Sequence, residues 1–81
     1  MKNRINEFCS KNRNYTDTAE LEQYLIDEFG GDCLTDFGVE YDKDLIFVSF
    51  RIDTEEDFFV VDLIIEENED EELEIESYSI I

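Results

Sequence analysis

The sequence predicts an α+β fold in a single domain, residues 1–81, with one or two N-terminal helices packed on a four-stranded antiparallel meander sheet. Three observations predict it. Apolar residues recur at helical spacing in residues 18–29, the spacing changes to every second residue after Gly31, and two nearly continuous apolar runs follow. Because short turns join the later elements, we expect neighbouring strands to run antiparallel, with the helices on one face.

Two helices are predicted before Gly31. In "RINEFCSKN", residues 4–12, Ile5, Phe8 and Cys9 form one apolar stripe of about two turns, and so short a helix must pack against something to persist. The second helix covers residues 18–29. It has Asp17 as N-cap with Glu20 three positions on, and it ends at Gly30-Gly31. Its apolar stripe consists of Leu21, Tyr24, Leu25 and Phe29.

Four strands are predicted after the helices. Residues 33–41 alternate between apolar and polar, which is typical of a half-exposed edge strand. Residues 45–52 and 58–66 are apolar on both faces and should be central. The fourth strand, residues 73–81, forms the other edge. In it we expect Leu73, Ile75 and Ile81 to point inward and Glu74 and Glu76 outward.

The two-faced central strands need a cover on each side. Leu45 and Phe47 share one face, and Ile46, Val48, Phe50 and Ile52 share the other. The helix at 18–29 supplies one cover, and either the N-terminal helix or a second copy of the chain supplies the other. A homodimer is therefore one expectation, favoured also by the net positive charge of the first thirteen residues.

The composition is extremely acidic. The chain has 24 acidic and 6 basic residues, a net charge of −18, whereas a small soluble domain commonly carries a magnitude of roughly 2 to 8. An apolar fraction of 42% is nevertheless enough for a core, so we expect a folded protein and not an acidic disordered tail. The absence of a long apolar run predicts no membrane association. Cys9 and Cys33 are expected to be free thiols in a cytoplasmic protein.

Residues for catalysis or for a cofactor are missing. The chain has no histidine and only three glycines, which removes the usual bases, zinc sites and phosphate loops. A calcium loop also fails, because Asp53, Glu55 and Asp57 match its first ligands but Phe58 and Ile64 stand where Gly and Glu are needed. We therefore predict a protein that is not an enzyme and holds no cofactor or metal.

The acidic residues near the C-terminus point to a binding function. In a meander, the turn at 42–44 and the segment 66–72 lie at the same end of the sheet. Glu72, Glu74 and Glu76 would share one face of a strand at intervals of about 6.8 Å, a regular spacing like that of nucleic-acid phosphates. The predicted binding surface consists of Asp42, Asp44, Glu66, Glu67, Glu69, Asp70, Glu71, Glu72, Glu74 and Glu76.

With its small size, its charge, and clusters such as "EENEDEE" and "DTEED", the chain resembles the small acidic proteins, often carried by phages, that mimic nucleic acid and block restriction enzymes, CRISPR effectors or DNA-repair enzymes. The resemblance is one of type and rests on no family motif. It implies an inhibitor, with an anti-CRISPR protein favoured, that acts in the cytoplasm of a bacterial host. Its partner would be a basic nucleic-acid-binding protein, a nuclease or CRISPR effector, and it would not itself bind nucleic acid.

Two alternatives stay open. An immunity protein or antitoxin that neutralises a basic toxin would also be small and acidic, and its interface would be anchored by an aromatic residue such as Tyr41 or Tyr78. The second alternative is a solvated acidic structural or interaction domain, in which the charge serves solubility alone.

Overall fold

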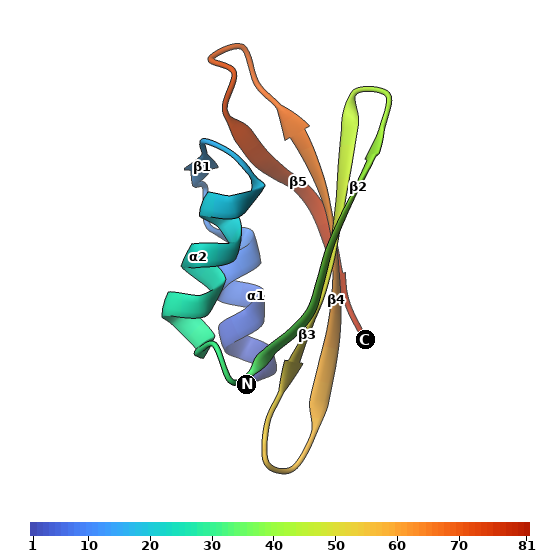
Figure 1. Cartoon of the computed structure of the whole chain (residues 1–81). Helices are drawn as coiled ribbons and strands as arrows, with labels where there is room; N and C mark the ends of the chain where they lie inside the picture. Colours follow the sequence, from blue (N-terminus) through green and yellow to red (C-terminus); the bar gives the residue numbers. More distant parts are fainter.

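The computed structural model describes residues 1–81 and has two helices on one face of a five-stranded antiparallel sheet (Figure 1). The helices are α1, Lys2–Ser10, and α2, Thr18–Phe29. The strands are β1, Asn14–Tyr15; β2, Leu34–Asp42; β3, Leu45–Asp53; β4, Phe58–Glu67; and β5, Leu73–Ile80. Their order in the sheet is β1-β5-β4-β3-β2. The predicted α+β class and the meander of the four long strands are confirmed.

The fifth strand corrects the prediction of four. β1 has two residues, which pair with β5 through Asn14 opposite Glu74 and Tyr15 opposite Leu73. Two residues are too few to show an alternating pattern, and their pairing partner lies far along the chain. β1 covers the outer edge of β5 only where that strand begins.

Local signals account for both helices. The bounds of α2 match the prediction, because the Asp17 carboxylate accepts a hydrogen bond from the Glu20 amide at 2.8 Å and the chain leaves the helix at Gly30 with φ of 94°. α1 begins two residues earlier than expected. Its apolar stripe of Ile5, Phe8 and Cys9 is buried, which supplies the packing that a nine-residue helix needs.

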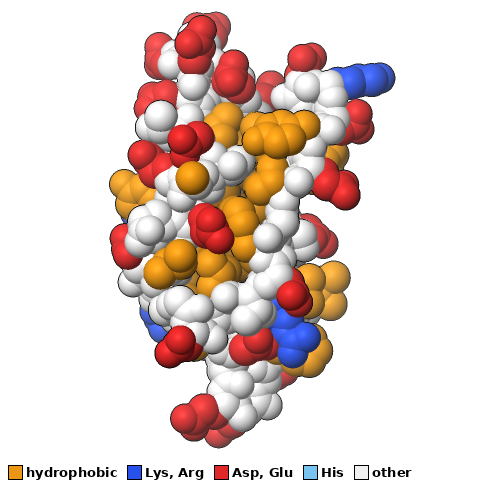
Figure 2. Space-filling view, in the orientation of Figure 1, with side chains coloured by type: hydrophobic (Ala, Val, Ile, Leu, Met, Phe, Trp, Pro, Cys, Tyr) orange, Lys and Arg blue, Asp and Glu red, His pale blue; other side chains and the backbone are white.

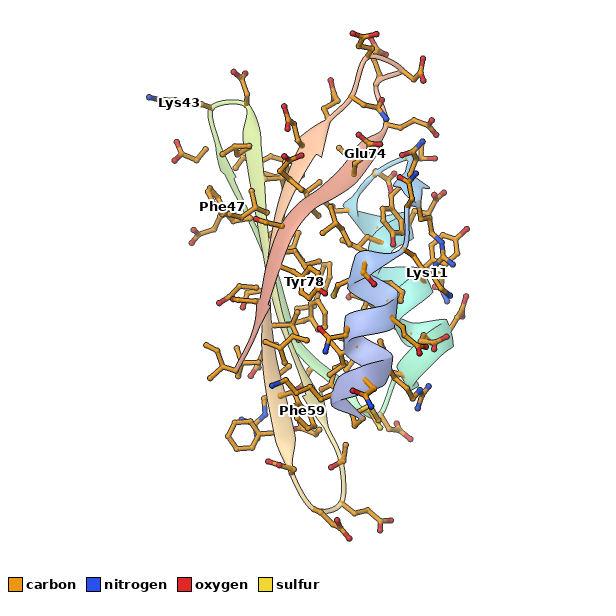
Figure 3. The ribbon with its side chains drawn as sticks, turned by 180° about the vertical axis from the view of Figure 1, so that it is seen from behind. Lys11, Lys43, Phe47, Phe59, Glu74 and Tyr78 are labelled. Carbon is orange, nitrogen blue, oxygen red and sulfur yellow. The ribbon has the colours of Figure 1, made fainter.

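Both helices lie on the same face of the sheet. The core is formed there by the helical stripes together with Val48, Phe50 and Ile52 of β3 and Val61, Leu63 and Ile65 of β4. The predicted separation of the two faces of β3 is confirmed. α1 is not the second cover, however, and the opposite face, which we call the open face, carries no helix. Phe47 lies on it, on the side of the sheet away from α1 (Figure 3).

A β-bulge changes the orientation of β5. Ile65 pairs with Ile75, but Ile64 pairs with Ser77, so Glu76 is an extra residue between them. Beyond this point Tyr78 and Ile80 pack against the core, and Ile81 is 78% exposed. The expectation that Ile81 points inward was therefore wrong, because the bulge shifts the alternation by one residue.

Candidate functional site

Two hairpins project together beyond the helices at one end of the sheet (Figure 1). The β2–β3 and β4–β5 turns meet there because Leu45 pairs with both Asp42 and Glu66, and Glu67 pairs with Leu73. Figure 2 shows carboxylates clustered on both hairpins. We call this region the acidic end, and it consists of Asp42, Asp44, Glu66, Glu67, Glu69, Asp70, Glu71, Glu72 and Glu74. Nine of the ten predicted binding residues are thus brought together.

One amide side chain organises the β4–β5 turn. The Asn68 Oδ1 atom accepts hydrogen bonds from the amides of Asp70, at 2.9 Å, and Glu72, at 3.0 Å. The Asn68 amide donates to the Glu72 carbonyl at 2.8 Å. Glu71 takes a left-handed conformation with φ of 62°. The exposed carboxylates of this turn are therefore carried on a backbone with defined hydrogen bonds.

The carboxylates form a row across the sheet, not along one strand. Asp42, Leu45, Glu66 and Glu74 stand opposite one another on successive strands. Neighbouring strands are about 4.8 Å apart, so the row extends roughly 14 Å over four strands. The predicted row along β5 is not formed. Glu72 lies in the turn, and Glu76, displaced by the bulge, lines a hollow beside α1 that is also bordered by Glu74, Lys11 and Arg13.

Few of these charges are neutralised within the protein. Only Glu28 and Asp53, of all the acidic side chains, lie within 4.0 Å of a basic group, at 3.7 Å from Arg4 and 2.6 Å from Arg51. The hydrogen bond from Arg51 holds the pKa of Asp53 below its ordinary value. Neither acid belongs to the acidic end, so every carboxylate there is left to solvent or to a partner.

The arginines are occupied by aromatic rings of their own chain. The guanidinium of Arg4 lies 5.2 Å from the centre of Phe29, that of Arg13 lies 4.4 Å from the centre of Tyr24, and that of Arg51 lies 4.0 Å from the centre of Phe58. The basic N-terminal segment thus helps to hold α1 and α2 together.

Added salt is expected to stabilise the fold, because it screens repulsion among these unpaired carboxylates. We expect the melting temperature to rise by about 5 °C between 0.02 and 0.5 M NaCl, equivalent to roughly 1 kcal/mol. The variant Glu67→Gln/Glu69→Gln/Glu71→Gln should melt higher at low salt and gain less from added salt. Equal gains for the two proteins would mean that the acidic end carries no electrostatic strain.

The two candidate aromatic anchors differ in accessibility. Tyr41 is 71% exposed and borders a notch of about 480 Å³ between the hairpins, lined also by Lys43, Asp44, Ile46, Glu66 and Glu67. Tyr78 is half-buried, and its hydroxyl donates to Asn6 Oδ1 of α1 at 3.2 Å. The bulge turns Tyr78 toward the helices (Figure 3), so Tyr41 alone is placed to contact a partner.

Sequence reasoning missed a hollow on the open face. It has a volume of about 630 Å³, and its apolar lining includes Phe47 and Ile64, with Gly38 of β2 beside them. The two-faced pattern of β3 and β4 indicated an apolar second face. The hollow itself arises where Gly38 lacks a side chain, next to a bulge that shifts β2 against β3 between Thr35 and Gly38.

No protein-family model, curated protein or solved structure matches the chain. No three histidine, cysteine or acidic side chains come together in an arrangement suited to a metal ion. Neither helix has the length and apolar character needed to cross a lipid bilayer.

Proposed function

We propose that this chain is a non-enzymatic acidic inhibitor that mimics nucleic acid and blocks the basic nucleic-acid-binding groove of a target nuclease or DNA-binding enzyme, with an anti-CRISPR protein as the favoured type. The observation that carries the proposal is the acidic end. Nine carboxylates lie on two adjoining hairpins, and none has a basic partner within the protein.

The proposed mechanism is an exchange of charge partners. Lysines and arginines that position a nucleic-acid backbone would form charge-assisted hydrogen bonds with the carboxylates instead. Repulsion among the carboxylates weakens in the complex, so part of the cost of holding them together in the free protein becomes binding free energy. The row of Asp42, Glu66 and Glu74 is the most ordered part of this surface, because each residue belongs to a paired strand.

The first experiment identifies the target and tests competition. The immobilised protein should retain a basic protein from a bacterial lysate at low salt and release it at high salt. The retained protein is then bound to a fluorescently labelled DNA or RNA duplex, and displacement of the duplex is followed by anisotropy. Competitive displacement is expected. Simultaneous binding of the duplex and the inhibitor would refute mimicry.

Two charge-matched variants locate the surface. Asp42→Asn/Glu66→Gln/Glu74→Gln removes three charges from the row, and Glu7→Gln/Glu55→Gln/Glu56→Gln removes three from α1 and from the β3–β4 turn at the opposite end of the sheet. We expect the first variant to displace the duplex about 10- to 100-fold less well, and the second to change little. Equal losses would mean that net charge alone acts.

One observation favours an immunity protein or antitoxin as the second candidate. Tyr41 stands exposed beside the carboxylates, as an aromatic anchor in a tight interface would. The anisotropy experiment separates the two functions. A toxin neutralised in this way would lose its activity while the labelled duplex stays bound.

A further inference from the structure

The hollow on the open face lies over a small apolar floor. Phe47 of β3 and Ile64 of β4 are directly opposite each other in the sheet, and both are half-buried. Gly38 of β2 is opposite Ser49, which lies two residues after Phe47 on the same face of β3. No atom lies within 4 Å of the position that a Cβ atom on Gly38 would occupy. The surface is therefore hollowed beside Ser49, next to Phe47 and Ile64, and the hollow of about 630 Å³ is large enough to receive an apolar side chain.

Carboxylates surround this floor. Glu40 and Asp62 line the hollow itself: Glu40 stands opposite Phe47, and Asp62 stands opposite Ser49, two residues from Ile64 along β4. The row of Asp42, Glu66 and Glu74 follows on the same face, toward the acidic end. The hollow is thus continuous with the surface to which the proposed function assigns binding.

The face holds almost no positive charge of its own. Arg51 is the only basic residue in the strands, and it is already held by Asp53 at 2.6 Å and by the ring of Phe58. A complementary partner must therefore supply both the apolar group and the cations.

A second copy of the chain would be a poor occupant by the same reasoning. Two open faces in contact would bring the carboxylates of one, Glu40, Asp62 and Glu66 among them, against those of the other. Arg51 is held by Asp53, and Lys43 lies outside the strands in the β2–β3 turn, so no free cation of the strands would lie between these carboxylates, and like charges held opposite one another are destabilising.

We propose that the open face is the docking surface for a basic protein segment, in which one apolar side chain enters the hollow over Phe47 and Ile64 while neighbouring lysines or arginines pair with Glu40 and Asp62. This inference rests on the proposed function and deepens it. The target's groove would be recognised by an apolar anchor between cations, as well as by the carboxylates of the acidic end.

The test uses two synthetic peptides as probes, KKWKK and KKGKK, titrated into the ¹⁵N-labelled protein and followed by amide chemical shifts. KKWKK should shift the amides around Gly38, Phe47 and Ile64 and bind about 5- to 10-fold more tightly than KKGKK, since only the former can bury an apolar side chain. KKGKK should shift mainly the acidic end. Identical shift maps and affinities for the two peptides would overturn the proposal.

Gly38→Val fills the hollow without straining the backbone, because Gly38 does not have a left-handed φ and its Cβ position is free. Ser79→Val is the matched control. Ser79 lies on the same face beyond Asp62, in β5 and outside the hollow. The advantage of KKWKK over KKGKK should vanish in Gly38→Val and survive in Ser79→Val. Loss of the advantage in both variants, or in neither, would contradict the assigned position.

A second variant keeps the test independent of how Gly38→Val folds. Glu40→Gln/Asp62→Asn preserves shape, and it should weaken binding of KKWKK about 3- to 10-fold. Unchanged affinity would count against pairing at the rim. Concentration-dependent dimerisation of the free protein that Gly38→Val abolishes would make a second copy the occupant and end the proposal. If the duplex is not displaced but the peptide results hold, the nucleic-acid mimicry fails while the docking surface stands.

Discussion

Replacing Phe50 with alanine is expected to lower the free energy of unfolding by about 3–5 kcal/mol. Phe50 is 1% exposed, lies in the middle of β3, and belongs to the core between the sheet and both helices. A domain of this size has roughly 5–10 kcal/mol of stability in total, so the variant should be partly unfolded at 37 °C. Urea denaturation followed by circular dichroism measures the change.

Phe58→Ala is the control for this prediction. Phe58 is the first residue of β4, next to β3, and its side chain is 50% exposed. The guanidinium of Arg51 lies over its ring. Its removal should cost only about 1 kcal/mol. Similar losses at Phe50 and Phe58 would show that the helices do not cover the face that the structure assigns to them.

The second large effect is a loss of stability in alkali. Burial raises the pKa of the Cys9 thiol from 9.0 to about 12. Between these two values the unfolded chain has released the proton and the folded chain has kept it, so unfolding is favoured as pH rises. The contribution of the Cys9 thiol to the free energy of unfolding is present in full below pH 9, and it should fall by about 1.4 kcal/mol per pH unit above pH 9. Tyr15, whose pKa burial also raises above 10.0, adds to the loss above pH 10.

Cysteine variants separate the thiol from the rest of the protein. Cys9→Ala leaves a small cavity and should be less stable at pH 8, but its free energy of unfolding should decline less steeply between pH 8 and 11. Cys33→Ala, at a half-buried position, should keep the steep decline. Parallel curves for the wild type and Cys9→Ala would assign the alkaline loss to other groups.

Much of the fold could be predicted because its signals are local. The bounds of α2 follow from the Asp17 cap and from Gly30, and β3 and β4 follow from long apolar runs between polar turns. β1 could not be predicted, because its two residues become a strand only through contact with β5. The side of the sheet on which α1 packs is likewise a property of the assembled core and is not encoded in the apolar stripe of α1.

The site could be predicted in position and not in detail. Meander topology alone places the turns after Asp42 and Glu67 at the same end, which is why most of the predicted carboxylates do meet. Glu76 is separated from the others by the bulge, whose one sign in the sequence is the adjacent polar pair Glu76 and Ser77, where the apolar residues change from positions 73 and 75 to positions 78 and 80. The hollow beside Gly38 depends on shape across three strands, which sequence spacing does not describe.

The bulge in β5 also bears on how such a chain can change in length. One codon, that of Glu76, separates the part of β5 that carries Glu74 of the acidic end from the part whose Tyr78 and Ile80 pack against the core. Loss of that codon would make Ile75 and Ser77 neighbours, and because they already pair with the neighbours Ile65 and Ile64, the bulge would disappear while Tyr78 and Ile80 kept facing the core. Whole-residue insertions or deletions in the turn at 68–72 would leave that register intact. The length of the turn in the acidic end and the presence of Glu76 can therefore both change without turning the core residues of β5 outward.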